Sequence, residues 1–234
     1  MRVLALVNHE VAGPGVFADE VRRQGHDLET WAPASEPLPR PPADYGAVIA
    51  FGGGMQVDQE DRHPWLREAF GVLQAAVEHA VPTLGVCLGA QMLARATGGA
   101  VGPAAEAECG WRPIQLTEAA DDDPLFAGQP RVFEVFQWHS YACELPPGAV
   151  ALARNDVCLQ SFRVGPCAWG VQWHPEVTGG SVAVWARRHR PAPGGVPVPI
   201  DLARLDMTIS ERMDATNADG RALCARFLAT AQDA

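Results

Sequence analysis

The sequence contains no lysine. All 18 of its strongly basic residues are arginines, against 28 acidic residues, and the formal net charge is −10. This absence excludes a lysine nucleophile, a lysine Schiff base and a glycine-rich phosphate loop that ends in lysine. The excess of negative charge opposes broad binding to nucleic acids or anionic membranes, so we expect neither as a partner.

Long apolar runs are also missing. The first seven residues, Met1–Val7, are apolar apart from Arg2, but this run is too short for a signal peptide. No stretch reaches the length of about 20 apolar residues that a membrane-spanning helix needs. These two absences predict a cytoplasmic protein.

The cysteines include no Cys-x-x-Cys pair. In a reducing compartment we expect them to be free thiols, five of them serving as small core or surface residues. The cysteines and histidines show no zinc-ligand spacing either. A zinc site assembled from cysteines and histidines across the chain is an alternative that no motif supports. The reaction predicted below requires neither a metal nor an organic cofactor. The six positions are Cys87, Cys109, Cys143, Cys158, Cys167 and Cys224.

The first hundred residues alternate strand-like apolar runs with amphipathic helical runs. Such alternation predicts a parallel sheet covered by helices on both faces, and 47% hydrophobic residues suffice for a core. We expect strands at 3–7, 26–31, 45–51 and 81–86, and helices at 16–24, 64–77 and 88–96. The second half is rich in strands, which we expect at 111–117, 131–136, 149–153, 158–164 and 168–173.

The domain organisation follows from a segment rich in proline and glycine at 189–199, which predicts a linker. Residues 1–188 are then expected to form one α/β domain, ending with a short helix. Residues 200–234 have apolar residues at helical spacing and predict a helical extension that packs on the domain or on a partner subunit. We place its N-cap at Asp201 and expect 217–220 as the place for a break.

The motif Pro82–Gln91 predicts a buried strand that ends at Cys87 and turns at once into a helix. Gly85 and Gly89 flank the turn, where the close crossing of strand over helix leaves no space for Cβ atoms. At a helix N-terminus a thiolate is favoured, and the N–H of Leu88 points toward the place of a tetrahedral oxyanion. Cys87 is therefore the predicted nucleophile, the alternative being one more buried cysteine.

A second motif, Gly170–Glu176, predicts the base. His174 and Glu176 are two residues apart, so on an extended segment their side chains leave from the same face. Glu176 can then fix the tautomer of His174 while the other ring nitrogen serves a thiol. His139 competes for this role, but we prefer His174 because a carboxylate follows it at this spacing.

Together the two motifs resemble the signatures of the class I (triad) glutamine amidotransferases, a Gly-x-Cys-x-Gly-x-Gln elbow and a Gln-Phe-His-Pro-Glu strand end. Here they are Gly85-Val-Cys-Leu-Gly-Ala-Gln91 and Gln172-Trp-His-Pro-Glu176. Within that family the chain is most similar to stand-alone domains like the amidotransferase half of GMP synthase. The resemblance implies a flavodoxin-like α/β fold: an open, mostly parallel sheet with helices on both faces, a cysteine nucleophile elbow and additional antiparallel strands in the second half.

The resemblance also assigns further site residues. Phe51-Gly-Gly-Gly-Met55 occupies the place of the family's oxyanion loop, so the N–H of Gly53 is expected to join that of Leu88 in holding an oxyanion. Gly54 stands where the family has proline, which loosens this loop, and Trp173 replaces phenylalanine, which enlarges a packing contact. The residues expected to bind the substrate are Gly54, Met55, Gln91, His139, Ser140 and Tyr141.

Three adjacent acids, Asp121–Asp123, are a further motif that a metal site could explain. Adjacent carboxylates do not converge on one ion without further ligands, so we interpret the run as a solvated loop. The predicted catalytic set remains Cys87, His174 and Glu176, with no metal.

The predicted reaction is hydrolysis of the glutamine side-chain amide through a γ-glutamyl thioester at Cys87, with release of ammonia. Because the sequence has no ATP-binding synthetase segment, ammonia would pass to an acceptor such as a partner synthetase, or be released. One alternative is an independent hydrolase that uses the same triad on another γ-glutamyl amide or peptide. A second alternative is a non-catalytic regulatory module.

Overall fold

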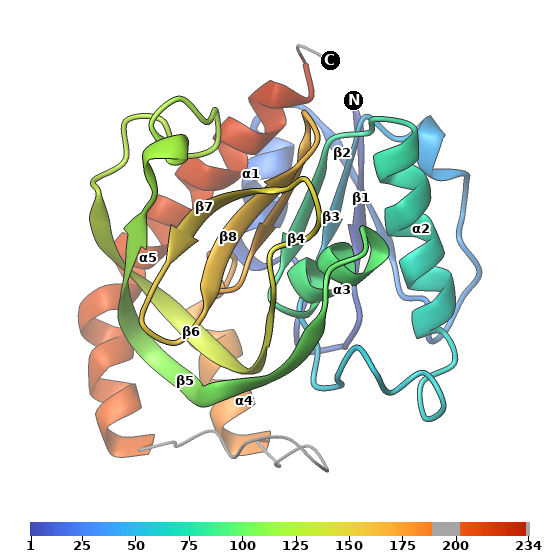
Figure 1. Cartoon of the computed structure of the whole chain (residues 1–234). Helices are drawn as coiled ribbons and strands as arrows, with labels where there is room; N and C mark the ends of the chain where they lie inside the picture. Colours follow the sequence, from blue (N-terminus) through green and yellow to red (C-terminus); the bar gives the residue numbers. More distant parts are fainter. Residues whose placement is uncertain (189–201, 233–234) are drawn as a thin grey trace.

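The computed structural model describes residues 1–188 and 202–232, so the predicted linker at 189–199 and the N-cap at Asp201 lie outside the described residues. Strands and helices follow one another along the chain as Figure 1 shows. The strands are β1 (Arg2–Leu6), β2 (Asp27–Trp31), β3 (Ala47–Ala50), β4 (Thr83–Val86), β5 (Val101–Leu116), β6 (Val132–Cys143), β7 (Val150–Arg154), β8 (Leu159–Val164) and β9 (Ala168–Val171). The helices are α1 (Gly15–Arg23), α2 (Leu66–Glu78), α3 (Leu88–Ala96), α4 (Gly179–Arg188) and α5 (Leu202–Thr230), with short 3-10 turns η1 (Pro42–Asp44) and η2 (Glu118–Ala120).

The described strands form one mixed sheet in the order β2-β1-β3-β4-β9-β8-β7-β5-β6. Strands β2, β1, β3, β4 and β9 are parallel, and the pairs from β9 to β6 are antiparallel. The predicted parallel core, with additional antiparallel strands in the second half, is therefore confirmed. The carboxyl ends of β1, β3, β4 and β9 meet at one edge of the sheet, where open α/β folds place their sites.

Strand β1 shows how helices cover both faces of the sheet. Its side chains alternate: Val3 points into a core cluster that includes residues of α1 and α5, and Leu4 points into a second cluster that includes residues of α2. Figure 1 shows α1 and α5 on one face of the parallel strands and α2 and α3 on the other. Both side chains are fully buried, and each such burial stabilises the fold by about 1.5–3 kcal/mol.

Strands β5 and β6 are longer than the predicted strands at 111–117 and 131–136. They span 16 and 12 residues and pair antiparallel from Val101 opposite Cys143 to Gln115 opposite Val132. Gly102 and Pro103 interrupt the sequence pattern, because glycine and proline are unfavourable inside strands. The ladder accommodates them with a register shift between Pro103 and Glu108.

Helix α5 is continuous over 29 residues, so the predicted break at 217–220 is wrong. Gly220 lies inside the helix and is buried. The apolar stripe of α5 packs on the domain itself, because Phe227 and Leu228 are fully buried in the cluster that contains Val3. Gly220 therefore does not break the helix. Its position in α5 is explained below by a close backbone contact.

The acidic run at 121–123 is only partly a solvated loop. Asp121 and Asp122 are exposed, but Asp123 is buried. It accepts hydrogen bonds from Arg163 Nε at 2.8 Å and from Trp169 Nε1 at 3.1 Å. Asp123 therefore anchors two antiparallel strands, and the prediction that it is solvated is wrong. No helix in the described part of the chain is long and apolar enough to cross a membrane.

Candidate active site

The turn from β4 into α3 holds Cys87 in a strained conformation, with φ 51° and ψ −108°. Such a positive φ is uncommon for a residue with a side chain. The two flanking glycines are required by close contacts. A Cβ atom at Gly85 would lie 2.5 Å from the carbonyl oxygen of Gly89, and one at Gly89 would lie 2.0 Å from that of Ala50. The sequence motif therefore forms the sharp strand-to-helix elbow that was predicted.

His174 and Glu176 follow β9 on a bent segment and not on an extended strand. The two side chains nevertheless meet, because Nδ1 of His174 lies 2.8 Å from Oε1 of Glu176 and both residues are buried. A carboxylate at this distance accepts the Nδ1 hydrogen and leaves Nε2 for another partner. The turn, not strand alternation, brings the imidazole and the carboxylate together.

The partner on the other side of the ring is Cys87, whose side chain is hydrogen-bonded to His174. Burial lowers the pKa of His174, but the Glu176 carboxylate and the Cys87 thiolate raise it more, and the pKa lies well above its usual value of 6.5. Gly52 completes the contact, since a Cβ atom there would lie 2.9 Å from Cε1 of His174 and 3.8 Å from Cβ of Cys87. The raised pKa favours an imidazolium beside the sulfur of Cys87.

Two helices hold the backbone of the segment His174–Glu176 through glycines. The N–H of Val16 donates to the carbonyl oxygen of Glu176 at 2.9 Å, and a Cβ atom at Gly15 would lie 1.8 Å from the same oxygen. A Cβ atom at Gly220 would lie 1.9 Å from the carbonyl oxygen of Pro175. Helices α1 and α5 therefore fix this segment by close backbone approach, which only glycine permits.

The loop after β3 brings Gly53 beside the elbow. A Cβ atom at Gly53 would lie 2.8 Å from Cδ2 of Leu88, whereas one at Gly54 would meet nothing within 4 Å. The loop is held at its base by Asn8, which donates from Nδ2 to the carbonyl oxygen of Phe51 at 2.7 Å and is buried. Sequence analysis missed Asn8, although its position directly after β1 at the carboxyl edge was a usable signal.

Two of the predicted substrate-binding side chains are engaged by the protein. Gln91 donates from Nε2 to the carbonyl oxygen of Tyr141 at 2.9 Å and to Oε1 of Gln172 at 3.1 Å. His139 lies with Nδ1 3.0 Å from the carbonyl oxygen of Tyr141 and Nε2 3.1 Å from Oε2 of Glu108. Both side chains are buried, so they hold strand β6 at Tyr141 through its backbone.

The remaining predicted residues, Ser140 and Met55, lie on strand β6 and on the oxyanion loop. Oγ of Ser140 accepts a hydrogen bond from Nε2 of Gln56 at 3.5 Å. This bond connects strand β6 to the residue that follows the oxyanion loop. Met55 is buried next to Gly53, where a Cβ atom would lie 2.6 Å from its sulfur. The thiol of Cys87 lies 3.8 Å from the carbonyl oxygen of Trp138 on strand β6. The elbow, the oxyanion loop and β6 therefore meet near Cys87.

A pocket of about 430 Å³ opens beside His174. Trp185 of α4 forms one wall, with its ring centroid 4.8 Å from that of His174 and its Nε1 donating to Val11 at 2.6 Å. At the rim, Arg188 donates to Glu10 at 2.8 Å. Sequence analysis missed Trp185, for which the helical pattern gave no signal. The pocket is lined by His9, Glu10, Val11, Ala12, Gly53, Gly54, Trp138, His174, Trp185 and Arg188.

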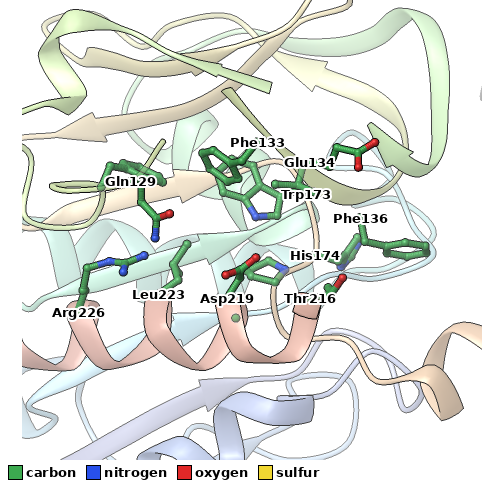
Figure 2. A pocket seen from close by; sticks show the side chains of 14 residues that line it. Gln129, Phe133, Glu134, Phe136, Trp173, His174, Thr216, Asp219, Leu223 and Arg226 are labelled. Carbon is green, nitrogen blue, oxygen red and sulfur yellow. The ribbon is translucent and has the colours of Figure 1, made fainter. Parts of the chain in front are cut away.

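A second, much smaller cavity of about 30 Å³ also borders His174. It lies between α5, the aromatic residues of β6 and Trp173, which follows β9. Figure 2 shows Thr216, Asp219 and Leu223 rising from α5 toward Trp173 and Phe133. This volume holds a water molecule or two but no amino acid. Of these two cavities, only the larger one has room for an amino acid.

The other five cysteines differ from Cys87 in environment. Burial raises the pKa of Cys109 to about 11 and the pKa of Cys158 to about 12. It raises the pKa of Cys143 to about 12, and it also raises the pKa values of Cys167 and Cys224. All six cysteines are free thiols, as predicted. Without a bound metal, burial therefore favours the protonated thiol at these five positions.

Fold and site together define an α/β protein with a cysteine at a strand-to-helix elbow, next to a buried histidine and glutamate. The sequence model of the family described as glutamine amidotransferase class-I matches residues 17–183. The chain belongs to this family, whose members are enzymes of the amidotransferase and hydrolase type. The predicted family and fold class are both confirmed.

Comparison with known proteins gives the same family. The chain is 33% identical to a subunit of the glutamine-hydrolyzing GMP synthase of Thermococcus kodakarensis over 62% of this chain and 74% of that protein. It is 34% identical to a gamma-glutamyl-L-1-hydroxyisopropylamide hydrolase of Pseudomonas sp. over 49% of this chain and 42% of that protein. The solved structure of a glutamine amidotransferase from Thermotoga maritima superposes with a TM-score of 0.84, at 27% identity over 97% of this chain and 98% of that chain.

Proposed function

We propose that the chain hydrolyses the side-chain amide of glutamine, with Cys87 as nucleophile, His174 as acid and base, and Glu176 as the group that orients His174. The observation that carries the proposal is the position of His174, which is hydrogen-bonded to Cys87 on one side and to Glu176 at 2.8 Å on the other. The raised pKa values of the other cysteines support the choice of Cys87.

The first half of the reaction forms a thioester. The sulfur of Cys87 bonds to the amide carbon, and the resulting oxyanion accepts hydrogen bonds from the N–H groups of Gly53 and Leu88. His174 gives its proton to the amide nitrogen, the carbon–nitrogen bond breaks and ammonia leaves. The product is a γ-glutamyl thioester at Cys87.

The second half of the reaction hydrolyses the thioester and regenerates the enzyme. Water gives a proton to His174 and adds to the thioester carbon, and the carbon–sulfur bond then breaks. Glutamate leaves, and Cys87 and His174 regain the thiolate and imidazolium forms. Glu176 keeps Nδ1 of His174 protonated throughout, so Nε2 remains the atom that exchanges the proton.

The amino-acid part of glutamine would lie against the oxyanion loop and strand β6, next to the elbow. Gln91 and His139 hold the backbone at Tyr141, and Ser140, Gly54 and Met55 border the same space. In this arrangement Gln91 and His139 position strand β6 at Tyr141, and backbone groups of this strand contact the substrate. The engaged side-chain atoms of Gln91 and His139 support this division of roles.

The ammonia acceptor is a separate part of the proposal. A relative at 33% identity is named as one subunit of a glutamine-hydrolyzing GMP synthase, and the lysine-free sequence contains no phosphate loop that ends in lysine. A partner that receives ammonia fits both observations. In this proposal residues 1–188 form the amidotransferase domain, and α5 completes it.

A second candidate function is supported by the pocket beside His174. The amine released by the enzyme leaves next to this imidazole, and ammonia does not require aromatic walls. Trp138 and Trp185 line a space of about 430 Å³ there, which suits the apolar substituent of a γ-glutamyl amide. A relative at 34% identity is named as a hydrolase of such an amide. The same triad would then act as an independent γ-glutamyl amide hydrolase.

One assay separates these functions. The purified chain is given glutamine and a panel of γ-glutamyl amides with apolar or charged substituents, with and without cell extract. An amidotransferase subunit should show weak glutaminase activity that rises with extract. An independent hydrolase should cleave one substituted amide at an ordinary rate, about 10 per second, without extract. The variant Trp185→Ala should then raise KM for the apolar amide and leave KM for glutamine nearly unchanged. A chain with no turnover and no reaction with an electrophilic glutamine analogue would be a non-catalytic module.

A further inference from the structure

A cluster of three side chains that can bind a metal lies outside the catalytic triad. Glu108 of β5, His139 of β6 and Cys158, the residue before β8, each bring one ligand atom within 4.8 Å of the other two. Glu108 and His139 are buried, and Cys158 is partly buried. The three residues are separated by 31 and 19 positions in the sequence, so no ligand spacing could predict them.

The orientation of His139 is the observation that points to a cation. Its Nδ1 lies 3.0 Å from the carbonyl oxygen of Tyr141, and its Nε2 lies 3.1 Å from Oε2 of Glu108. Both neighbours are hydrogen-bond acceptors. An imidazolium would donate to both, whereas a neutral imidazole donates to one and can bind a cation with its other nitrogen. When Nδ1–H donates to the carbonyl, Nε2 faces the carboxylate with a lone pair, and a cation between them satisfies both. A metal-bound histidine typically makes this Nδ1–H bond to a carbonyl.

The carboxylate of Glu108 is oriented by a hydrogen bond from a neighbouring side chain. Asn155 donates from Nδ2 to Oε1 of Glu108 at 2.7 Å. The other end of the Asn155 amide is fixed, because its Oδ1 accepts from the N–H of Val157 at 3.0 Å and of Cys158 at 2.9 Å. This asparagine therefore connects two members of the cluster and orients Oε2 toward the third. Hydrogen bonds that orient a ligating carboxylate are typical of metal sites.

A fourth ligand is available from Gln160. Its amide end lies 3.0 Å from Oε2 of Glu108 and 3.2 Å from Sγ of Cys158. A half-turn of the amides of Gln160 and Gln137 keeps the 2.7 Å hydrogen bond between them in the reverse sense and turns Oε1 of Gln160 toward the cluster. Gln137 allows this change, because its buried Oε1 has no hydrogen-bond partner within the described part of the chain.

We infer that Glu108, His139 and Cys158 bind a zinc ion, with Oε1 of Gln160 as the fourth ligand. A set of nitrogen, sulfur and two oxygens matches zinc, whereas magnesium and calcium take oxygen ligands alone. Tetrahedral zinc with the usual bond lengths has ligand atoms about 3.3–3.7 Å apart. Here Oε2 of Glu108 lies 3.1 Å from Nε2 of His139 and 4.0 Å from Sγ of Cys158, so small side-chain shifts close the site.

The zinc site is structural. It joins the β5–β6 pair to the turn between β7 and β8, and through Tyr141 it reaches the elbow helix. The carbonyl oxygen of Tyr141 accepts from both His139 and Gln91, and Gln91 belongs to α3. A metal at this position therefore stiffens strand β6 at Tyr141 without taking part in the chemistry, and its presence does not depend on the proposed reaction.

The test is metal binding by the full chain in a Cys87→Ser background, which removes the triad thiol as a competing ligand. Zinc is titrated against a chromophoric chelator, and cobalt is used as a spectroscopic substitute for zinc. We expect one metal per chain, a cobalt–thiolate charge-transfer band and a higher melting temperature with zinc. Cys158→Ser and His139→Gln should each weaken zinc binding by about tenfold to a hundredfold or more.

The matched control is Cys109→Ser. Cys109 follows Glu108 on β5, so its side chain leaves from the opposite face, and this variant should bind metal like the parent. Absence of a cobalt–thiolate band, or a band that survives Cys158→Ser, would overturn the inference. If Cys158→Ser does not fold, His139→Gln decides, because zinc affinity equal to that of the parent would exclude His139 as a ligand.

Discussion

The carbonyl oxygen of Pro175 lies so close to Gly220 that a Cβ atom at Gly220 would be 1.9 Å from it. Pro175 sits between the two triad residues that follow β9, and Gly220 belongs to α5, 45 residues further along the chain. The C-terminal helix therefore contacts the backbone next to His174 and helps to set the position of its imidazole. This contact makes a glycine essential in the middle of a helix, where glycine usually destabilises.

Replacing Gly220 by alanine should disturb catalysis. The new methyl group cannot fit against the Pro175 oxygen, so either α5 or the segment His174–Glu176 must shift. A misplacement of about 1 Å at a catalytic group lowers the rate by about a hundredfold. We expect kcat for glutamine to fall by that order and the melting temperature to fall as well, measured by an ammonia-release assay and by thermal unfolding.

The matched control for this prediction is Gly71→Ala. Gly71 is an exposed residue inside α2, and a Cβ atom there would meet nothing within 4 Å. Alanine at this position should stabilise the protein by about 0.4–1 kcal/mol and leave kcat unchanged. Equal effects of the two substitutions would show that the contact between α5 and Pro175 does not position the imidazole.

Removal of the elbow thiol should abolish activity. Cys87→Ala is expected to release no ammonia from glutamine while keeping the melting behaviour of the parent, and an electrophilic glutamine analogue should no longer add mass to the protein. Cys143→Ala serves as control, since burial raises the pKa of this thiol to about 12, and it should still be labelled once. Labelling of Cys109, Cys143 or Cys158 at the rate of Cys87 would contradict the assignment.

The roles of His174 and Glu176 predict an order of effects. His174→Ala removes the group that transfers the proton, whereas Glu176→Gln keeps a hydrogen-bonding partner for Nδ1 and removes only its charge. The variant at Glu176 should therefore retain more activity, because the orienting acid is the least costly triad member to remove. The comparison uses kcat/KM for glutamine, and rates in the reverse order would exclude the proposed division of labour.

The same pair predicts a pH dependence of stability. The pKa of His174 is raised well above 6.5, so its imidazolium stabilises the fold fully below the unfolded pKa of about 6.5, and this contribution is lost as pH rises through the folded pKa. Glu176→Gln removes the negative charge that contributes most to raising the pKa of His174. The difference in free energy of unfolding between parent and variant, measured by urea unfolding, should shrink from about pH 6 toward alkaline pH. A constant difference would contradict the raised pKa.

The oxyanion loop offers a contrasting pair of substitutions. Gly54→Ala fits, because nothing lies within 4 Å of the added methyl group, and it should favour the ordered loop by about 0.4–1 kcal/mol. We expect kcat/KM of the isolated chain to rise by about twofold to fivefold. Gly53→Ala should lower it by at least tenfold, since its methyl group would lie 2.6 Å from the sulfur of Met55 and 2.8 Å from Cδ2 of Leu88. A fall of the same size in both variants would contradict the proposed roles.

The sequence predicted the elbow well, because its physics is local. Gly85, Cys87 and Gly89 lie within five residues, and the contact between Gly85 and Gly89 follows from the turn itself, whereas the approach of Gly89 to Ala50 comes from the neighbouring strand β3. The contact between His174 and Glu176 was predicted for the same reason, although a turn and not an extended segment produces it. The parallel core was predictable too, since alternating strand and helix patterns determine that architecture.

What the sequence could not predict depends on contacts between distant segments. His174 was preferred over His139 because a carboxylate follows it, yet His139 has a carboxylate partner as well, Glu108, which lies 31 positions earlier. Only the proximity of Cys87 separates the two histidines. Gly220 was interpreted as a break because its close neighbour, Pro175, is remote in sequence. Trp185 enters the site in the same way, through the packing of α4.

The dependence of the His174–Glu176 segment on α5 also determines when the site can form during synthesis. A growing chain that has reached residue 188 already contains Cys87, His174 and Glu176. It does not yet contain Gly220 or the apolar residues of α5 that complete the core against the sheet. Domains generally fold as units as the chain emerges from the ribosome. We therefore expect Cys87 to meet His174 only after translation has passed α5. Unfinished chains would then carry Cys87, His174 and Glu176 without an assembled site.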